Sequence, residues 1–369
     1  MVLFAVIFLF KFAEKAFNKK IAVLSSILLI TNPIFFIASR QARIDIGVVT
    51  FTLGSLLFYL LGKEKKNTTY FLASGLFAGF AFITHLNGIL TIIALYIFLL
   101  FDKNLVKKET TYASLGAVLG LIPYLMWIYS DSGAYVTQMT QMYGNRMSIL
   151  DSGFWVKNIV NEFTRYSAIR TVFGLVPLLL LGAFSFKRNK YLFIHVMTYF
   201  FGLWLLISNK TGAYLIYLVP ALCIFSGVTL QKTSIKKIVA IFLILLNISV
   251  ISYWFVTYHD REYYDVTAEI SVLIDDNPIV LAEPRFWLST RPQPFYSIHH
   301  LKLSNLTLND AFSKNKVNTV IVDFFVRSFM NENKELLIQD TIHTHCHKTK
   351  EFVDPLYPKE NIEIYRCNI

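Results

Sequence analysis

The chain has 369 residues, of which 55% are hydrophobic, 16% aromatic and only 16% charged. A soluble protein of this length carries more charge on its surface, so the composition excludes that class and indicates an integral membrane protein. The formal net charge of +11 does not indicate nucleic-acid binding, because the lysines lie in short clusters between apolar runs.

Ten apolar segments occupy the first 256 residues. Each is close to, or somewhat shorter than, the ~20 residues that cross a bilayer as a helix. We therefore expect an α-helical polytopic bundle over residues 1–256. The segments are 1–12, 21–38, 46–62, 69–84, 88–101, 112–130, 171–186, 191–207, 212–229 and 238–256.

Basic clusters in alternate connections predict the topology. If each apolar segment crosses once, five clusters fall on one side, which the positive-inside rule makes the cytoplasm. The opposite side then holds residues 39–45, 85–88, 131–170 and 208–212 and everything after about 257. The clusters are Lys11, Lys15, Lys19 and Lys20; Lys63, Lys65 and Lys66; Lys103, Lys107 and Lys108; Lys187, Arg188 and Lys190; and Lys232, Lys236 and Lys237.

The long outer loop 131–170 is rich in Tyr, Met, Gln and Asn. Loops of this length in a compact fold are usually functional or disordered. Residues 154–163 have apolar side chains at helical spacing, which predicts an interfacial helix lying on the outer leaflet.

Three charges lie at the mouth of two apolar segments, in the stretch 38–45. Charges this close to hydrocarbon mark a function or a pairing partner. Arg40 and Arg43 can donate bidentate hydrogen bonds to phosphate oxygens. Asp45 can orient an acceptor hydroxyl, act as a base, or hold a divalent cation against a phosphate. The alternative is a helix-end anchor, in which an arginine reaches the headgroups and Asp45 caps the next helix.

Further polar residues are predicted on the same face. Lys210 adds a point charge there. His85 lies where segment 69–84 emerges from the membrane, and it is either part of the site or a structural residue at a helix end. Polar groups gathered on one side of the bilayer suit a membrane-embedded substrate, with its phosphate bound by the charges and its lipid tail received by the helices.

The tail 257–369 has ordinary polarity and forms a second predicted domain. Residues 265–274 have the pattern of a helix, and 279–282, 320–323 and 362–366 have the pattern of strands. Strands separated by helical stretches predict a small extracytoplasmic α/β domain.

Three histidines at positions 343, 345 and 347 alternate at strand period. On a strand their imidazoles share one face, where they either bind zinc or simply face solvent. No fourth ligand is evident, which favours the solvent-facing strand.

The cysteines divide between the two predicted domains. Cys346 and Cys367 lie outside the membrane, where an oxidising compartment permits a disulfide. Cys223 lies in an apolar segment and is expected to serve packing.

Three motifs in order resemble a known family. Arg40-x-x-Arg43-x-Asp45 after a membrane helix, the small-residue segment 75–84, and Lys210-x-x-x-Tyr214 followed by Pro220 are similar to the motifs of the GT-C-fold glycosyltransferases that use polyprenyl-phosphate sugars. These include the dolichyl-phosphate-mannose protein mannosyltransferase-like proteins and the lipid A aminoarabinose transferase. The resemblance covers about residues 20–230. This chain has His85 where the family commonly has lysine.

The resemblance implies an inverting transfer, in which an acceptor hydroxyl attacks the anomeric carbon and the lipid phosphate departs. Arg40, Arg43 and Lys210 would stabilise the charge that develops on the phosphate, with His85 and Tyr214 also in the binding site. A divalent cation, Mg or Mn, is a possible cofactor by the same resemblance.

Family members carry their presumed base, an acidic residue, in a first outer loop. This sequence begins in what resembles the family's second helix, so we expect that the first helix and its loop are missing. Asp45 then corresponds to the second acidic position, near phosphate or metal. Asp131 and Asp151 are weaker candidates for the base, because loop carboxylates are usually just solvated.

These observations favour a multi-pass cell-membrane glycosyltransferase that moves a sugar from a polyprenyl-phosphate donor to a lipid, glycan or protein acceptor at the outer face. Two alternatives remain at this stage: a transporter or flippase for a lipid-linked glycan, and a truncated, non-catalytic relative that binds lipid phosphate. A transporter needs polar or charged residues in mid-membrane, whereas charges here gather at one mouth.

Overall fold

The computed structural model divides the chain into two compact units, Met1–Ser252 and Tyr253–Ile369. The boundary predicted from composition, between residues 256 and 257, lies a few residues further on. The structure describes residues 1–40, 43–102, 107–133, 135–136, 169–206, 212–232, 236–259, 269–272, 279–282, 294–298, 310, 312–313, 316–332, 338–354 and 360–367. The predicted interfacial helix 154–163 lies outside these residues.

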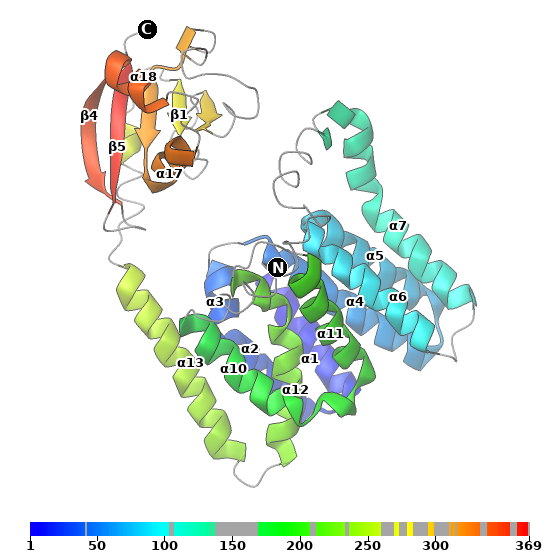
Figure 1. The fold of residues 1–369 in the computed structure, drawn as a ribbon. Helices are drawn as coiled ribbons and strands as arrows, with labels where there is room; N and C mark the ends of the chain where they lie inside the picture. Colours follow the sequence, from blue (N-terminus) through cyan, green and yellow to red (C-terminus); the bar gives the residue numbers. More distant parts are fainter. Residues whose placement is uncertain are drawn as a thin grey trace. The chain divides into compact units, whose positions relative to one another are not determined.

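The first unit is a helical bundle (Figure 1). Each of the ten apolar segments overlaps one or more helices. These are α1 (Val2–Ala16), α2 (Lys19–Ile30), α3 (Pro33–Arg40), α4 (Asp45–Lys65), α5 (Thr68–Thr84), η1 (Leu86–Gly88), α6 (Ile89–Phe101), α7 (Lys107–Ser130), α10 (Ile169–Ala183), η2 (Phe186–Arg188), α11 (Lys190–Leu206), η3 (Gly212–Tyr217), α12 (Val219–Lys232) and α13 (Lys236–His259).

Three of the described helices are long and apolar enough to cross a membrane alone: α4, α7 and most of α13. The segment predicted over 21–38 is instead the pair α2 and α3, bent by 59°, and it raises that number to four if it counts as one span. Proline at position 33 cannot continue the ladder of α2, and the Asn32 side chain accepts hydrogen bonds from the backbone N–H groups of Ile34 and Phe35 to start α3.

Helices α5 and α7 pack at close range, side by side in Figure 1. A Cβ atom added at Gly75 would lie 1.9 Å from the backbone oxygen of Ala113, and one added at Gly116 would lie 2.0 Å from that of Leu72. No side chain larger than hydrogen fits at such distances. Small residues that admit backbone contact are typical of helix pairs in membranes.

Helix α4 is tied to α6 and α11 at its C-terminal end. The Lys63 ammonium lies 2.7 Å from a carboxylate oxygen of buried Asp102, and the Tyr191 hydroxyl donates to the same oxygen at 2.6 Å. The Tyr59 hydroxyl donates to the backbone oxygen of Phe98 at 3.2 Å. A buried carboxylate needs such partners, because removing one of them leaves an uncompensated charge.

The second unit contains a five-stranded sheet of order β2-β1-β3-β5-β4. Strands β1 and β3 are parallel neighbours, as are β1 and β2, whereas β5 runs antiparallel to both β3 and β4. Strands β1, β3 and β5 overlap the three segments predicted as strands. The strand bounds are β1 (Val280–Ala282), β2 (Phe295–Ser297), β3 (Thr319–Val322), β4 (Cys346–Val353) and β5 (Asn361–Cys367).

Two helices share one face of this sheet. α17 (Phe324–Glu332) and α18 (Ile338–His345) contribute Val326 and Ile342 to the same buried cluster as Val320 of β3. The alternate strand residue Ile321 belongs to the cluster on the other face. Of the predicted helix 265–274, the structure describes only residues 269–272, which are helical.

The prediction that the three histidines share a strand was wrong, although all three are exposed. His343 and His345 lie on helix α18, and only His347 lies on a strand, β4. Ile338 and Ile342 are spaced four apart, as on one side of a helix, and Ile342 packs in the buried cluster on the sheet. Among the described residues there is no group of three or more His, Cys, Asp or Glu that could hold a metal ion, so the three imidazoles form no zinc site there.

Cys346 and Cys367 form a disulfide between the paired strands β4 and β5, and Cys223 is a buried free thiol in α12.

Replacing both bonded cysteines with serine is expected to lower the free energy of unfolding of the second unit by about 3 kcal/mol, because the bond closes a loop of moderate length. Urea unfolding followed by tryptophan and tyrosine fluorescence, with and without reductant, checks this. The Cys223→Ser variant is the control. In this variant the second unit should have the same stability as in wild type, both with and without reductant. Equal stability of the double variant and wild type would contradict the expectation.

Candidate functional site

Asp45 begins helix α4, and its residue is only 1% exposed although it is charged. One carboxylate oxygen, Oδ2, accepts a hydrogen bond from Nε of Arg43 at 2.9 Å and forms an ion pair with Nη2 of the same arginine at 2.8 Å. The N-terminal end of a helix also favours a negative charge. Arg43 and the helix end therefore both compensate the negative charge of this carboxylate inside the bundle.

The other carboxylate oxygen, Oδ1, accepts a hydrogen bond from the hydroxyl of Tyr217, the last residue of η3. The Asn87 amide, in η1, lies 3.5 Å from the same hydroxyl. Elements far apart in the sequence are thus joined at Asp45. Both carboxylate oxygens of Asp45 therefore already have partners, and the residue is too buried to offer a substrate much surface.

Three aromatic side chains, Tyr217, Tyr214 and His85, form a row that begins at this carboxylate, here called the aromatic row. Tyr214 and Tyr217 are stacked, with ring centroids 6.3 Å apart and planes 9° apart. This follows from the 3-10 helix η3, in which side chains three residues apart eclipse one another. The ring of His85 lies 5.9 Å from that of Tyr214, and its Nδ1 accepts a hydrogen bond from the backbone N–H of Asn87.

A group of buried hydroxyls adjoins the site. The oxygens of Thr91 and Tyr199 are 2.7 Å apart, and that of Thr52 is 2.7 Å from Thr91. The Tyr199 ring lies 5.3 Å from the Tyr217 ring. These hydrogen bonds join α4, α6 and α11, and Tyr199 packs its ring against that of Tyr217.

The predicted site residues are brought together only in part. Asp45 and Arg43 pair directly, and His85 and Tyr214 lie in the aromatic row next to them. Arg40 is exposed at the end of α3. Lys210 and Asp151 lie outside the described residues, and Asp131 is exposed beyond the end of α7.

Tyr217 and Asn87 belong to the site but do not stand out in the sequence. Tyr217 is one tyrosine among 20, in an apolar segment where packing explains an aromatic residue. The available signal was its position three residues after Tyr214. Such a spacing predicts a shared face only once that stretch is known to be a 3-10 helix.

The site offers a poor set of ligands for a divalent cation. Magnesium prefers an octahedral shell of oxygens, mostly carboxylate, phosphate or water. Asp45 is the only carboxylate that the described contacts place here, and an arginine and a tyrosine occupy its two oxygens. The described residues of this site therefore do not fit a divalent cation.

Comparisons with known proteins concern the family and the fold. Residues 1–127 match the family model described as dolichyl-phosphate-mannose-protein mannosyltransferase. A comparison with curated protein sequences finds no match.

Two solved structures are similar in fold. ArnT from Cupriavidus metallidurans bound to undecaprenyl phosphate has a TM-score of 0.58 at 13% identity, covering 98% of this chain and 82% of that chain. The apo state of ArnT from the same organism has a TM-score of 0.60 at 12% identity, covering 98% and 81%. The family match and the shared fold confirm that this chain resembles the GT-C-fold glycosyltransferases in both sequence and structure.

Proposed function

We propose that this chain is a membrane glycosyltransferase that moves a sugar from a polyprenyl-phosphate donor to an acceptor at the outer face of the membrane. The observation that carries the proposal is the buried Asp45 carboxylate, which fixes Arg43 and Tyr217 at one end of apolar helices. A fixed cation beside apolar helices suits a ligand with an anionic head and a hydrocarbon tail.

Arg43 is the group proposed to bind the donor phosphate. Its guanidinium has five N–H donors in a planar fork, of which those on Nε and one on Nη2 face Asp45. Its side chain is 34% exposed. Donors on the remaining edge are therefore available to phosphate oxygens, an interaction in which arginine is stronger and more directional than lysine.

The proposed reaction is a displacement at the anomeric carbon. The acceptor hydroxyl forms a bond to this carbon, and the bond from the carbon to the phosphate oxygen breaks. The polyprenyl phosphate leaves with the electron pair, and the hydroxyl proton passes to a base. Arg43 stabilises the growing charge on the phosphate, since donors already in place where charge develops lower the barrier. Asp131 and Asp151 stay as predicted candidates for the base.

Asp45 acts in this scheme as a positioning residue. Both its oxygens already accept hydrogen bonds, so it is not free to take a proton from an acceptor. It holds the Arg43 guanidinium in one orientation, which is valuable because small displacements of a catalytic group cost large factors in rate.

The relatives support a lipid-linked donor. ArnT, similar in fold, is known bound to undecaprenyl phosphate. The acceptor is a lipid, a glycan or a protein, as predicted from the sequence, and the outer-face location rests on the distribution of lysines.

Replacing Arg43 with alanine is expected to weaken binding of undecaprenyl phosphate by about 10- to 100-fold, the value of one or two charged hydrogen bonds. Binding to the full chain in lipid nanodiscs, measured by native mass spectrometry, checks this. Arg188→Ala is the matched control, because Arg188 is exposed at the opposite, lysine-rich side of the predicted topology. Equal affinities of the Arg43→Ala and Arg188→Ala variants would overturn the proposed phosphate site.

A further inference from the structure

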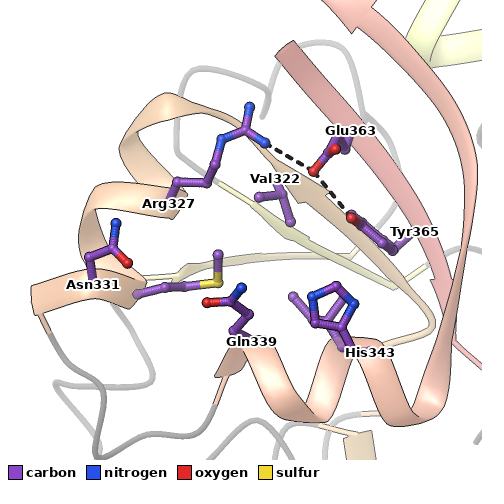
Figure 2. A pocket seen from close by; sticks show the side chains of 9 residues that line it. Val322, Arg327, Asn331, Gln339, His343, Glu363 and Tyr365 are labelled. Carbon is purple, nitrogen blue, oxygen red and sulfur yellow. Dashed lines mark hydrogen bonds and ion pairs between the residues drawn. The ribbon is translucent and has the colours of Figure 1, made fainter. Parts of the chain in front are cut away.

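A pocket of about 310 Å³ lies within the second unit, between helices α17 and α18 and strand β5 (Figure 2). Its polar side chains come from all three elements: Arg327 and Asn331 from α17, Gln339 and His343 from α18, and Glu363 and Tyr365 from β5. The two residues on β5 are two positions apart, so they face the same side of the sheet as the helices.

Arg327 and Glu363, the two residues with formal charges that line this pocket, pair with each other. One terminal nitrogen of Arg327 donates to Glu363 at 2.9 Å, and the other donates to the backbone oxygen of Asn361. The Glu363 oxygen that binds Arg327 also accepts from the Tyr365 hydroxyl at 3.1 Å. Burial, together with the charge of Glu363, raises the pKa of Tyr365, so this hydroxyl keeps its proton. An anion would find the arginine engaged, and a cation would find the carboxylate engaged.

The remaining polar side chains of the lining are two amides and an imidazole. Asn331, Gln339 and His343 are exposed, and within the described residues none of their side chains makes a hydrogen bond. Amides and imidazoles each combine donor and acceptor atoms. Such groups pair with ligand hydroxyls, which also both donate and accept.

The floor of the pocket is apolar. Val322, Met330 and Ile342 lie under the polar rim, and Val322 and Ile342 are almost completely buried. The ring of Tyr365 adds an aromatic surface. A ligand that suits this lining has C–H groups on one face and hydroxyls around its edge, and the volume is at the small end for a ligand site.

We propose that this pocket binds a neutral saccharide of one or two rings. A sugar ring combines an apolar C–H face with a rim of hydroxyls, which matches the floor and rim described here. This binding site goes beyond the transfer of a sugar at Asp45, and it does not require that transfer to occur.

The test measures binding of methyl glycosides of glucose, galactose, mannose and N-acetylglucosamine, and of the corresponding disaccharides, by saturation-transfer difference NMR. The full chain is held in phosphatidylcholine nanodiscs, because detergents with sugar headgroups would compete. Glucuronate and glucose 6-phosphate are the charged probes. At least one neutral glycoside is expected to bind with a Kd in the millimolar range, of the order found for small, weakly held ligands.

Two variants connect this binding to the pocket. His343→Ala and Gln339→Ala are each expected to weaken the interaction by about 3- to 10-fold, the value of one neutral hydrogen bond. His345→Ala is the matched control, because His345 is exposed on the same helix but does not line the pocket. All three changes are on the surface and leave the fold intact.

Three outcomes would overturn the proposal: no neutral glycoside binds, the charged probes bind more tightly than every neutral one, or His343→Ala and His345→Ala behave alike. Asp45→Asn separates this site from the proposed transferase. Retained sugar binding in that variant is expected, whether or not the chain transfers sugar, whereas its loss would show that the measured sugar occupies the Asp45 site.

Discussion

Asp45→Asn is expected to lower the rate of sugar transfer about 100-fold, the effect of misplacing a catalytic group by roughly an ångström. Asparagine has almost the same shape but no charge, so the hydrogen bond and the ion pair from Arg43 to Oδ2 lose their charged partner. The guanidinium is then free to rotate away from the phosphate. Consumption of a panel of undecaprenyl-phosphate-linked sugars in native membranes, which supply the acceptor, measures this.

Asp102→Asn provides the matched control. Asp102 is also buried and also pairs with a basic side chain, Lys63, at the other end of α4. This variant should be less stable but should transfer sugar at the wild-type rate per folded molecule. A positioning role predicts that Asp45→Asn changes both kcat and the KM for the donor, because Arg43 acts on the bound and the departing phosphate. Wild-type kinetics in Asp45→Asn would refute that role.

Gly116→Ala is expected to destabilise the first unit by about 3 kcal/mol or more, the upper range for overpacking a core. The added Cβ would lie 2.0 Å from the backbone oxygen of Leu72, and backbone cannot rotate out of the way as a side chain can. Helices α5 and α7 must then separate. Thermal unfolding of the purified chain in nanodiscs, followed by circular dichroism, measures the loss.

Gly182→Ala is the control for this change. Gly182 lies in α10, where the nearest atoms to an added Cβ are side-chain carbons at 3.4 Å, an ordinary contact. Alanine is favoured over glycine inside a helix by roughly 0.5–1 kcal/mol, so this variant should be as stable as wild type or more stable. Opposite signs for the two substitutions are the expected result. Equal stability would show that the α5–α7 contact is not close.

The helical positions could be predicted from the sequence because apolar runs of near-span length have few alternative structures. The break at residues 31–33 was also visible in principle, since Asn32 followed by proline is a helix-starting signal. Hydropathy alone predicts one continuous segment over 21–38, because it does not register the ladder hydrogen bond that proline removes. The cysteine pair was predicted as a possible disulfide, and strands β4 and β5 bring the two thiols together.

The histidines at 343 and 345 show what local spacing leaves undecided. Alternation over five residues is compatible with a strand, but neighbouring Ile338 and Ile342 fit a helix, and packing on the sheet decided for the helix. Strand β4 was not predicted because its side chains are mostly polar and exposed, so it lacks the apolar alternation of an inner strand.

The site could be predicted only where its residues are close in sequence. Arg43 and Asp45 are two positions apart, and their pairing follows from charge and proximity. The bond from Tyr217 to Asp45 crosses 172 positions and depends on how η3 folds against α4. No local pattern encodes such a contact.

Helix α4 has polar ties at both ends, and this limits how the bundle can move. Arg43 and Tyr217 fix its first turn, while Asp102 and Tyr191 fix its last turn, about 27 Å away at 1.5 Å per residue. A helix bonded at both ends can neither slide along its axis nor tilt without breaking buried ionic contacts. An opening that keeps these contacts intact must therefore come from helices that are not tied to α4.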